Sequence, residues 1–191
     1  MAIEIRDLTP ALWPALEKLF GKNGASGGCW CMFWRLKQGE RYPEIKGPRL
    51  KRRFKVRVAK GEVLGALAFS DGEPVAWVTY GPRLTFPRLE RSPSLACEDA
   101  DRVWSVPCFF IKAGFRNQGL ASLMLAHAVE RMRQRGVSTV EGYPVKPTRD
   151  GRPLPGAFAY TGTTAMFERA GFERTLDSAH AKVRMRRRLQ R

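Results

Sequence analysis

The sequence Val106-Pro107-Cys108-Phe109-Phe110-Ile111 is followed, after a short connection, by Arg116-Asn117-Gln118-Gly119-Leu120-Ala121. The first segment is apolar and predicts a buried strand, and the second predicts a tight basic turn that leads into a helix. The first turn of a helix has backbone N–H groups without intrahelical partners and carries the positive end of the helix dipole, so it attracts anions. Gly119 and Ala121 leave the backbone of this turn accessible, and Arg116 adds a cation that can bind phosphate oxygens. The two segments together predict a pyrophosphate site.

Apolar residues continue at helical spacing from Leu120 to Met132, and Gly136 then provides a stop signal. The chain has no Gly-Lys-Ser or Gly-Lys-Thr, which excludes a P-loop, and no Gly-x-Gly-x-x-Gly after a strand, which argues against a dinucleotide fold. What remains is the pattern Arg116-x-x-Gly119-x-Ala121 directly after an apolar strand. This pattern resembles the phosphate turn of the GCN5-related N-acetyltransferase (GNAT) family.

The resemblance covers roughly residues 62 to 188 and implies a mixed α/β fold. In that fold a mostly antiparallel central sheet is flanked by helices and splays open at the strand that binds the cofactor, acetyl-CoA. The pantetheine arm of acetyl-CoA lies beside that strand like an extra strand. The residues that match the cofactor site are Phe109, Phe110, Ile111, Arg116, Asn117, Gln118, Gly119, Leu120 and Ala121.

Other segments agree in order and spacing. Two strand-like runs, 64–69 and 75–80, are joined by Ser70-Asp71-Gly72-Glu73-Pro74, a hairpin signal. Pro107 cannot donate to a sheet ladder, so it fits a strand at which the sheet opens. Further along, the sequence predicts a strand over 137–143 and a last helix over 164–172. The N-terminal part predicts a strand over 3–6, a helix over 9–20 capped by Thr9 with Pro10 at its first position, and a helix within 47–60.

Acetyl transfer to an amine needs a base for the amine, a donor for the developing oxyanion and a proton for the leaving thiolate. The backbone N–H near Phe109 is the expected oxyanion donor. Some relatives place a carboxylate early on the cofactor strand, but Ser105 stands there, and the resemblance instead points to Glu141 on the following strand as the base. Many relatives place a tyrosine on the last helix as the acid, where this chain has Phe167. Tyr160 is the candidate replacement, with Tyr143 or departure of the thiolate without an acid as alternatives.

The acceptor side is expected in residues 21–60 and in the long loop 83–101. The aromatic segment around Trp30 and Trp34 predicts either an acceptor pocket that contains both rings or a plug of the core. The amine itself does not follow from the sequence, since small amines, aminoglycosides, amino acids, peptide N-termini and lysine side chains are all acceptors of this scaffold.

Composition favours one domain over residues 1–191, with the cofactor-binding core at about 104–173. No apolar run has the length of a transmembrane helix and no signal peptide is visible, so we expect a cytoplasmic protein that does not contact membranes. Four cysteines without a second ligand pair argue against a metal site and, in a reducing compartment, against a disulfide. A ping-pong route through a cysteine is not expected, because nothing in the sequence pairs a thiol with a base.

The formal charge of +16, from 34 Lys and Arg against 18 Asp and Glu, allows two interpretations. A basic surface attracts coenzyme A and equally attracts nucleic acid. The alternative to an enzyme is therefore a protein of the same fold that has lost its acid and uses its basic surface to hold nucleic acid or a ribosomal partner. No nucleic-acid-binding motif is present, so the enzyme is favoured. Oligomeric state does not follow from the sequence, which leaves a homodimer open.

Overall fold

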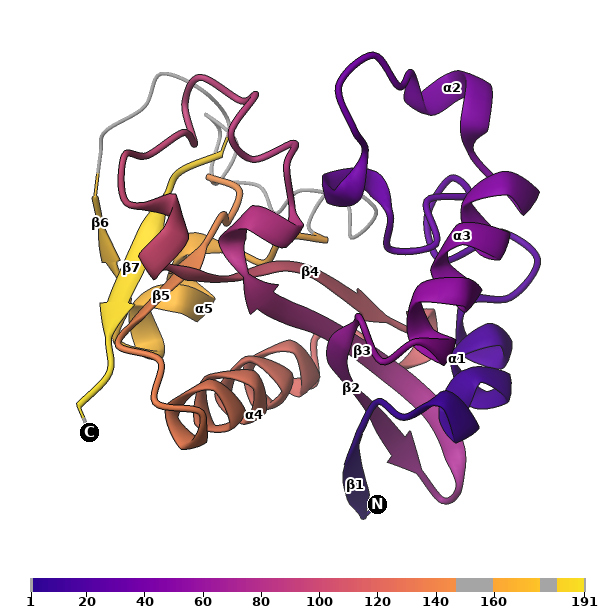
Figure 1. Cartoon of the computed structure of the whole chain (residues 1–191). Helices are drawn as coiled ribbons and strands as arrows, with labels where there is room; N and C mark the ends of the chain where they lie inside the picture. The colour runs from indigo at the N-terminus through magenta and orange to yellow at the C-terminus, as the bar shows by residue number, and fades with distance from the viewer. Residues whose placement is uncertain (1, 147–159, 176–181, 191) are drawn as a thin grey trace.

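The protein is described here by a computed structural model that covers residues 2–146, 160–175 and 182–190. Its centre is a single twisted sheet in the strand order β1-β2-β3-β4-β5-β7-β6 (Figure 1). Neighbouring strands are antiparallel except for β4 and β5, which run parallel. The expected mixed, mostly antiparallel sheet is thus confirmed. The strands are β1 Ile3–Asp7, β2 Leu64–Ser70, β3 Glu73–Pro82, β4 Trp104–Ile111, β5 Thr139–Gly142, β6 Glu173–Arg174 and β7 Met185–Arg188.

Helix α4 lies against one face of the sheet, whereas α1 and α3 cover the opposite face (Figure 1). No helix among the described residues is long and apolar enough to cross a bilayer. The α-helices are α1 Trp13–Phe20, α2 Tyr42–Ile45, α3 Pro48–Ala59, α4 Leu120–Gln134 and α5 Thr164–Arg169, and the 3₁₀ turns are η1 Pro10–Leu12, η2 Phe33–Arg35, η3 Arg83–Thr85, η4 Ala100–Arg102 and η5 Ala113–Phe115.

The alternation of side chains along β3 divides the interior into two cores. Ala76 and Val78 point to the α4 side, whereas Trp77 between them packs with Phe54 of α3 and Phe20 of α1. On the α4 side, Met124 is fully buried. Each such fully buried large apolar side chain contributes about 1.5–3 kcal/mol to the hydrophobic stabilisation. Both faces of the sheet are therefore covered, which leaves the strand edges as the part of the sheet that a ligand can reach.

The sheet opens at Pro107, as the sequence predicts. Strand β4 pairs with β5 only through Trp104, Ser105 and Val106, and the pairing stops one residue before the proline, which has no N–H. On its other side β4 carries a β-bulge, because Val106 and Pro107 together lie opposite Tyr80. Beyond this point β4 remains paired with β3 alone, and its free edge faces a gap.

The N-terminal helix begins differently from the prediction. A 3₁₀ turn, η1, precedes α1, and the Thr9 side chain makes no capping hydrogen bond. The Leu12 N–H, which a capping side chain could have bound, donates instead to the backbone carbonyl oxygen of Thr9 at 3.0 Å. Thr9 thus occupies the cap position and Pro10 the first position of the turn, as predicted, but the predicted capping by the Thr9 side chain is wrong.

Candidate active site

A groove of about 540 Å³ opens where β4 and β5 separate. One wall is the free half of β4, the floor is the turn that leads into α4, and the other wall comes from the segment before α5 and from α5 itself. The residues that line the groove are Ala25, Ser26, Phe109, Phe110, Ile111, Phe115, Arg116, Asn117, Gly119, Leu120, Ala121, Ser122, Tyr160, Gly162, Thr163, Met166 and Arg169.

The turn at the end of the groove has the backbone geometry of an anion site. Asn117 and Gly119 both have positive φ, at 60° and 79°, which aims successive N–H groups into the concave side of the turn. Gly119 is the N-cap of α4, and no side chain caps the first turn of this helix. A Cβ built on Gly119 would meet no atom within 4 Å, so the space in front of these amides is open. The geometry fits a phosphate group held by the helix N-terminus.

Eight of the nine residues predicted for the cofactor line this groove. The exception is Gln118, whose side-chain amide donates to the Gly114 carbonyl oxygen at 3.0 Å and which braces the turn from outside. Arg116 lines the groove, and its Nε donates to the carbonyl oxygen of Ile111 at 3.1 Å. Its other guanidinium nitrogens are thereby held near the turn.

The amide of Phe109, expected as oxyanion donor, already has a partner. Its N–H donates to the carbonyl oxygen of Tyr160 at 2.6 Å. Tyr160 thus lies against the free edge of β4 just beyond the point where β5 leaves it. An acetyl oxygen at this amide has to replace the Tyr160 carbonyl, which makes the position of Tyr160 relevant to the reaction.

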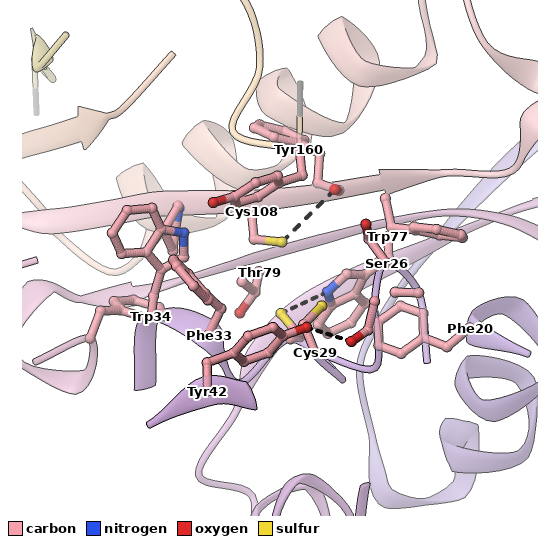
Figure 2. Close-up of a pocket in the computed structure, with 17 residues that line it drawn as sticks. Phe20, Ser26, Cys29, Phe33, Trp34, Tyr42, Trp77, Thr79, Cys108 and Tyr160 are labelled. Atoms are coloured by element: carbon pink, nitrogen blue, oxygen red, sulfur yellow. Dashed lines mark hydrogen bonds between the residues drawn. The ribbon is translucent and has the colours of Figure 1, made fainter. Parts of the chain in front are cut away.

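A second cavity, of about 200 Å³, lies next to the groove on the side of α1 and α2 (Figure 2). Nine of its 17 lining residues are aromatic, and five of the lining residues also line the groove, so the two cavities adjoin along the free part of β4. We refer to this second cavity as the acceptor pocket. Its lining consists of Phe20, Ala25, Ser26, Gly27, Cys29, Cys31, Phe33, Trp34, Tyr42, Trp77, Thr79, Phe86, Pro107, Cys108, Phe109, Phe110 and Tyr160.

The structure separates the two tryptophans that the sequence placed together. Trp34 lines the acceptor pocket, where its ring packs at 5.2 Å from that of Phe33. Trp30 does not line it, because its ring stacks at 6.1 Å on Trp13 and packs at 5.7 Å against Phe20. Trp30 is thus part of the core of α1 and α3, and only Trp34 is placed to contact a ligand in the pocket. The loop 83–101 supplies Phe86 to the same pocket.

Three cysteines line the acceptor pocket: Cys29 and Cys31 from one loop, and Cys108 from β4, which is distant in the sequence. Figure 2 labels Cys29 and Cys108. Cys31 Sγ accepts a hydrogen bond from Trp77 Nε1 at 3.2 Å. Burial opposes its ionisation, but a hydrogen bond from Cys108 and the charge of Arg35 outweigh burial and lower the pKa of Cys31. The hydrogen bond with Cys31 and burial raise the pKa of Cys108 well above its ordinary value. No local pattern in the sequence indicates this meeting, because it depends on how the loop around Cys29 folds over β3 and β4.

Glu141, the predicted base, lies in a buried ion-pair network at the closed end of β4 and β5. Its side chain is 0% exposed. One carboxylate oxygen accepts from Arg186 Nε at 2.6 Å, and the other accepts from Arg83 and from the Tyr143 hydroxyl at 2.8 Å. The Ser105 hydroxyl lies 2.6 Å from the Tyr143 oxygen. Neither Glu141 nor Tyr143 lines the groove or the acceptor pocket, so the role of Glu141 as a base stays a prediction.

Tyr160 lies where the two cavities meet, since it lines both of them. Its ring packs 6.2 Å from Phe33, and Lys182 Nζ lies 4.8 Å from the ring centre. Burial, and next the nearby Cys108 thiol, raise the pKa of Tyr160 well above its ordinary value. The phenol therefore carries its proton at neutral pH and can donate a hydrogen bond at the junction.

The comparison with known proteins agrees with this geometry. Residues 30–148, more than half of the chain, match the model of the acetyltransferase (GNAT) family. No curated protein sequence matches the chain. Among solved structures, the chain resembles the PaiA N-acetyltransferase from Thermoplasma acidophilum in complex with coenzyme A, with a TM-score of 0.59 at 15% identity over 99% of this chain and 100% of that one.

Two further structures share the fold. One is the GNAT domain of PAT from S. lividans, with a TM-score of 0.58 at 18% identity over 98% of this chain and 90% of that chain. The other is a ribosomal-protein-alanine N-acetyltransferase from Brucella melitensis, with a TM-score of 0.55 at 16% identity over 97% of this chain and 99% of that chain. At this level of identity the structures establish the fold alone. Together with the family match over residues 30–148, they show that the chain belongs to the GNAT family of acetyltransferases.

Proposed function

We propose that the protein is an N-acetyltransferase that moves an acetyl group from acetyl-CoA to an amine. The observation that carries this proposal is the groove at the splay of β4 and β5, which ends at the uncapped first turn of α4. A strand edge that β5 leaves uncovered beyond Val106, apart from the hydrogen bond from Phe109 N–H to the Tyr160 carbonyl oxygen, and an anion site lie at the two ends of one continuous cavity. This arrangement suits a ligand that has a peptide-like arm and a diphosphate.

In this proposal the pantetheine arm lies along Phe109 to Ile111 and uses the free edge of β4. The diphosphate lies at the turn of Arg116 to Ala121, where it meets the backbone amides and the Arg116 guanidinium. The thioester then lies near Tyr160, at the opening into the acceptor pocket. An amine bound in that pocket attacks the thioester directly, without an acyl-enzyme intermediate.

The proton balance at the junction involves Tyr160. The leaving sulfur needs a proton, and the Tyr160 hydroxyl, which is protonated at neutral pH, supplies it and takes one from the attacking nitrogen, so the products are an amide and the free thiol of coenzyme A and the tyrosine is unchanged. Glu141 acts at a distance in this scheme, because it joins β5 to the turn after β3 through Arg83 and to β7 through Arg186 rather than touching a ligand. The same network reaches β4 through the Tyr143 hydroxyl, which donates to Glu141 and lies 2.6 Å from the Ser105 hydroxyl, so its effect on the reaction is to support the end of β5 beside β4.

The proposal is tested by adding acetyl-CoA to the purified protein. A ligand that binds only the native state raises the melting temperature, and coenzyme A should do so as well, whereas acetate alone should not. Release of free thiol from acetyl-CoA in the presence of amines then reports turnover. An unchanged melting curve with acetyl-CoA at millimolar concentration would rule out the cofactor and with it the proposed reaction.

A further inference from the structure

We infer that the acceptor is a compact aromatic amine that is uncharged near neutral pH, such as a single-ring aniline. The inference rests on the proposed function and names the substrate class of the same site. Three independent features of the acceptor pocket support it: its size and aromatic lining, the missing carboxylate and a buried cation behind one wall.

The size of the pocket limits the acceptor to about one ring. Its volume is about 200 Å³. An apolar protein cavity of roughly 150 Å³ holds one benzene molecule, so this pocket accommodates a ring with a small substituent and no longer chain. The Phe33 ring already packs edge-on against Trp34, Tyr42 and Tyr160, at 5.2, 5.6 and 6.2 Å. Another ring can join such a cluster in the edge-to-face geometry that aromatic pairs prefer.

The pocket offers no carboxylate or imidazole that would accompany or deprotonate an ammonium ion. None of its 17 described lining residues is Asp, Glu or His. An alkylamine arrives protonated, loses its hydration in an apolar pocket without a counter-charge and still has to lose a proton before it can attack. An aniline is neutral at the same pH, so its nitrogen lone pair is available without a base.

A buried cation near the pocket further raises the free energy of binding a positively charged acceptor. Arg35 is 5% exposed and its guanidinium donates to Thr79 Oγ1 at 3.2 Å, where Thr79 lines the pocket. Arg35 forms no ion pair with a carboxylate among the described residues, and its Nε has no hydrogen-bond partner there. Burial lowers the pKa of Arg35 to about 10, so the side chain is still charged at neutral pH. The potential in this part of the pocket repels an ammonium ion.

The reaction is balanced without a further reactant. The lone pair of the neutral amine forms a bond to the acetyl carbon, and the carbon–sulfur bond of the thioester breaks. The nitrogen loses one proton, and the coenzyme sulfur gains one, through Tyr160 as proposed above. An aromatic pocket also attracts cations through its ring faces, which is the competing interpretation that the experiment has to decide.

The experiment compares three amines of similar size in the thiol-release assay. p-Toluidine is aromatic and neutral, cyclohexylamine has a ring but is protonated, and benzylamine is aromatic but protonated. We expect kcat/KM for p-toluidine to exceed the other two by at least about tenfold at pH 7, with little change between pH 6 and 8, because desolvation of an unpaired ammonium costs more than one power of ten. The two alkylamines should gain steadily as the pH rises.

A pair of variants then tests the missing carboxylate. Cys108 is half-buried and lines the pocket, so Cys108→Asp introduces a carboxylate and Cys108→Asn is its neutral, isosteric control. We expect the aspartate variant to raise the ratio of benzylamine to p-toluidine turnover by about tenfold relative to the asparagine variant, since a nearby opposite charge stabilises the ammonium ion. An equal ratio in the two variants would show that charge in this pocket does not select the acceptor.

The outcomes distinguish a wrong acceptor class from a wrong cofactor. If acetyl-CoA raises the melting temperature but benzylamine or cyclohexylamine reacts as fast as p-toluidine, or if none of the three reacts, the acceptor class is wrong and the cofactor assignment stands. If acetyl-CoA leaves the melting temperature unchanged, the proposed function fails and the acceptor assignment falls with it. Faster turnover of p-toluidine with a flat pH profile supports both.

Discussion

The groove and the acceptor pocket adjoin along the same strand edge, yet they are built in different ways. The groove offers backbone amides, an uncapped helix N-terminus and the side chains of Arg116 and Arg169. The acceptor pocket offers nine aromatic rings and three thiols, and none of its described lining residues bears a carboxylate, ammonium or guanidinium group. One cavity is suited to an anion and a polar chain, and the other to an uncharged ring.

The difference shows how a strongly basic chain can contain an apolar binding site. Some of the basic side chains are used inside the protein, where Arg83 and Arg186 both bind the buried Glu141. These ion pairs lie near the end at which β4 and β5 are paired with each other. The other end is left to open into the groove, with the acceptor pocket beside it. The four predictions below test this division, from the largest expected effect to the smallest.

The largest effect is expected in the buried network around Glu141. Glu141→Gln leaves the fully buried Arg83 and the partly exposed Arg186 beside an uncharged amide, and breaking a buried ion pair in this way typically costs about 3–5 kcal/mol of unfolding free energy. Urea unfolding at neutral pH measures the loss. Glu168→Gln is the matched control, because Glu168 makes one exposed ion pair with Arg174 and should change stability by less than about 1 kcal/mol. A loss of turnover without a loss of stability would instead favour the predicted role of Glu141 as a base.

The second effect is confined to the groove. Gly119→Glu places a carboxylate in front of the α4 amides and repels a diphosphate, so it should remove the stabilisation by acetyl-CoA, which amounts to about 2.7 kcal/mol at a ligand concentration of 100 times Kd. Since any side chain at a φ of 79° introduces strain, Gly119→Asn serves as the neutral control. The asparagine variant should retain most of the rise in melting temperature. Equal binding of acetyl-CoA by both variants would show that the first turn of α4 does not hold the diphosphate.

The third effect lies at the junction of the two cavities. Tyr160→Phe removes the hydroxyl but leaves the backbone carbonyl that accepts from Phe109 N–H. We expect kcat to fall by roughly tenfold with little change in acetyl-CoA binding, at the low end of acid catalysis because a thiolate is a good leaving group. Tyr42→Phe is the comparison, since Tyr42 lines only the acceptor pocket and donates to the Gly27 carbonyl oxygen at 2.6 Å. It should alter the KM of the acceptor more than kcat.

The two cavities also differ in how far the sequence predicts them. The groove comes largely from one continuous segment, Phe109 to Ser122, in which strand, turn and helix follow one another with recognisable local signals. Eight of its lining residues could therefore be named in advance. Gln118 was predicted as well but does not line the groove, and the residues from α5 and the segment before it were not predicted as part of the cofactor site. The hairpin before it and the opening of the sheet at Pro107 are local in the same sense, and the structure confirms both.

The acceptor pocket depends on contacts between segments that are distant in the chain, and local patterns do not encode these. Trp30 and Trp34 are four residues apart in one aromatic segment, but positive φ at Trp30 and Cys31 turns the backbone between them. One ring then enters the core and the other the pocket. The meeting of Cys31 with Cys108 has the same origin. Glu141 is a further example of what the sequence does not predict. Its position on β5 is as predicted, but its ion-pair partners come from a loop and from β7, which are distant in the chain.

The smallest effect tests the outer edge of the ion-pair network. Arg186 donates two hydrogen bonds to Asp99, of 2.6 and 2.8 Å. They are the main reason why the pKa of Asp99 is lowered to about 2. A carboxyl whose pKa is depressed on folding stabilises the protein above its unfolded pKa of about 3.9, and this contribution is lost as the pH falls towards 2. Because solvent reaches this pair, Asp99→Asn should lower the unfolding free energy at pH 7 by less than about 1 kcal/mol.

The same Asp99→Asn variant should approach the parent protein as the pH falls below 4, where the parent loses its own contribution. Urea unfolding at several pH values measures the convergence, and Asp101→Asn, at a neighbouring exposed position with a nitrogen–oxygen distance of 3.9 Å to Arg102, is the control. A constant difference between parent and variant from pH 7 to pH 3 would mean that the Asp99 charge contributes nothing. Arg186 would then contribute to the ion-pair network through Glu141 alone, and the stability of β5 beside β7 would depend on that single buried carboxylate.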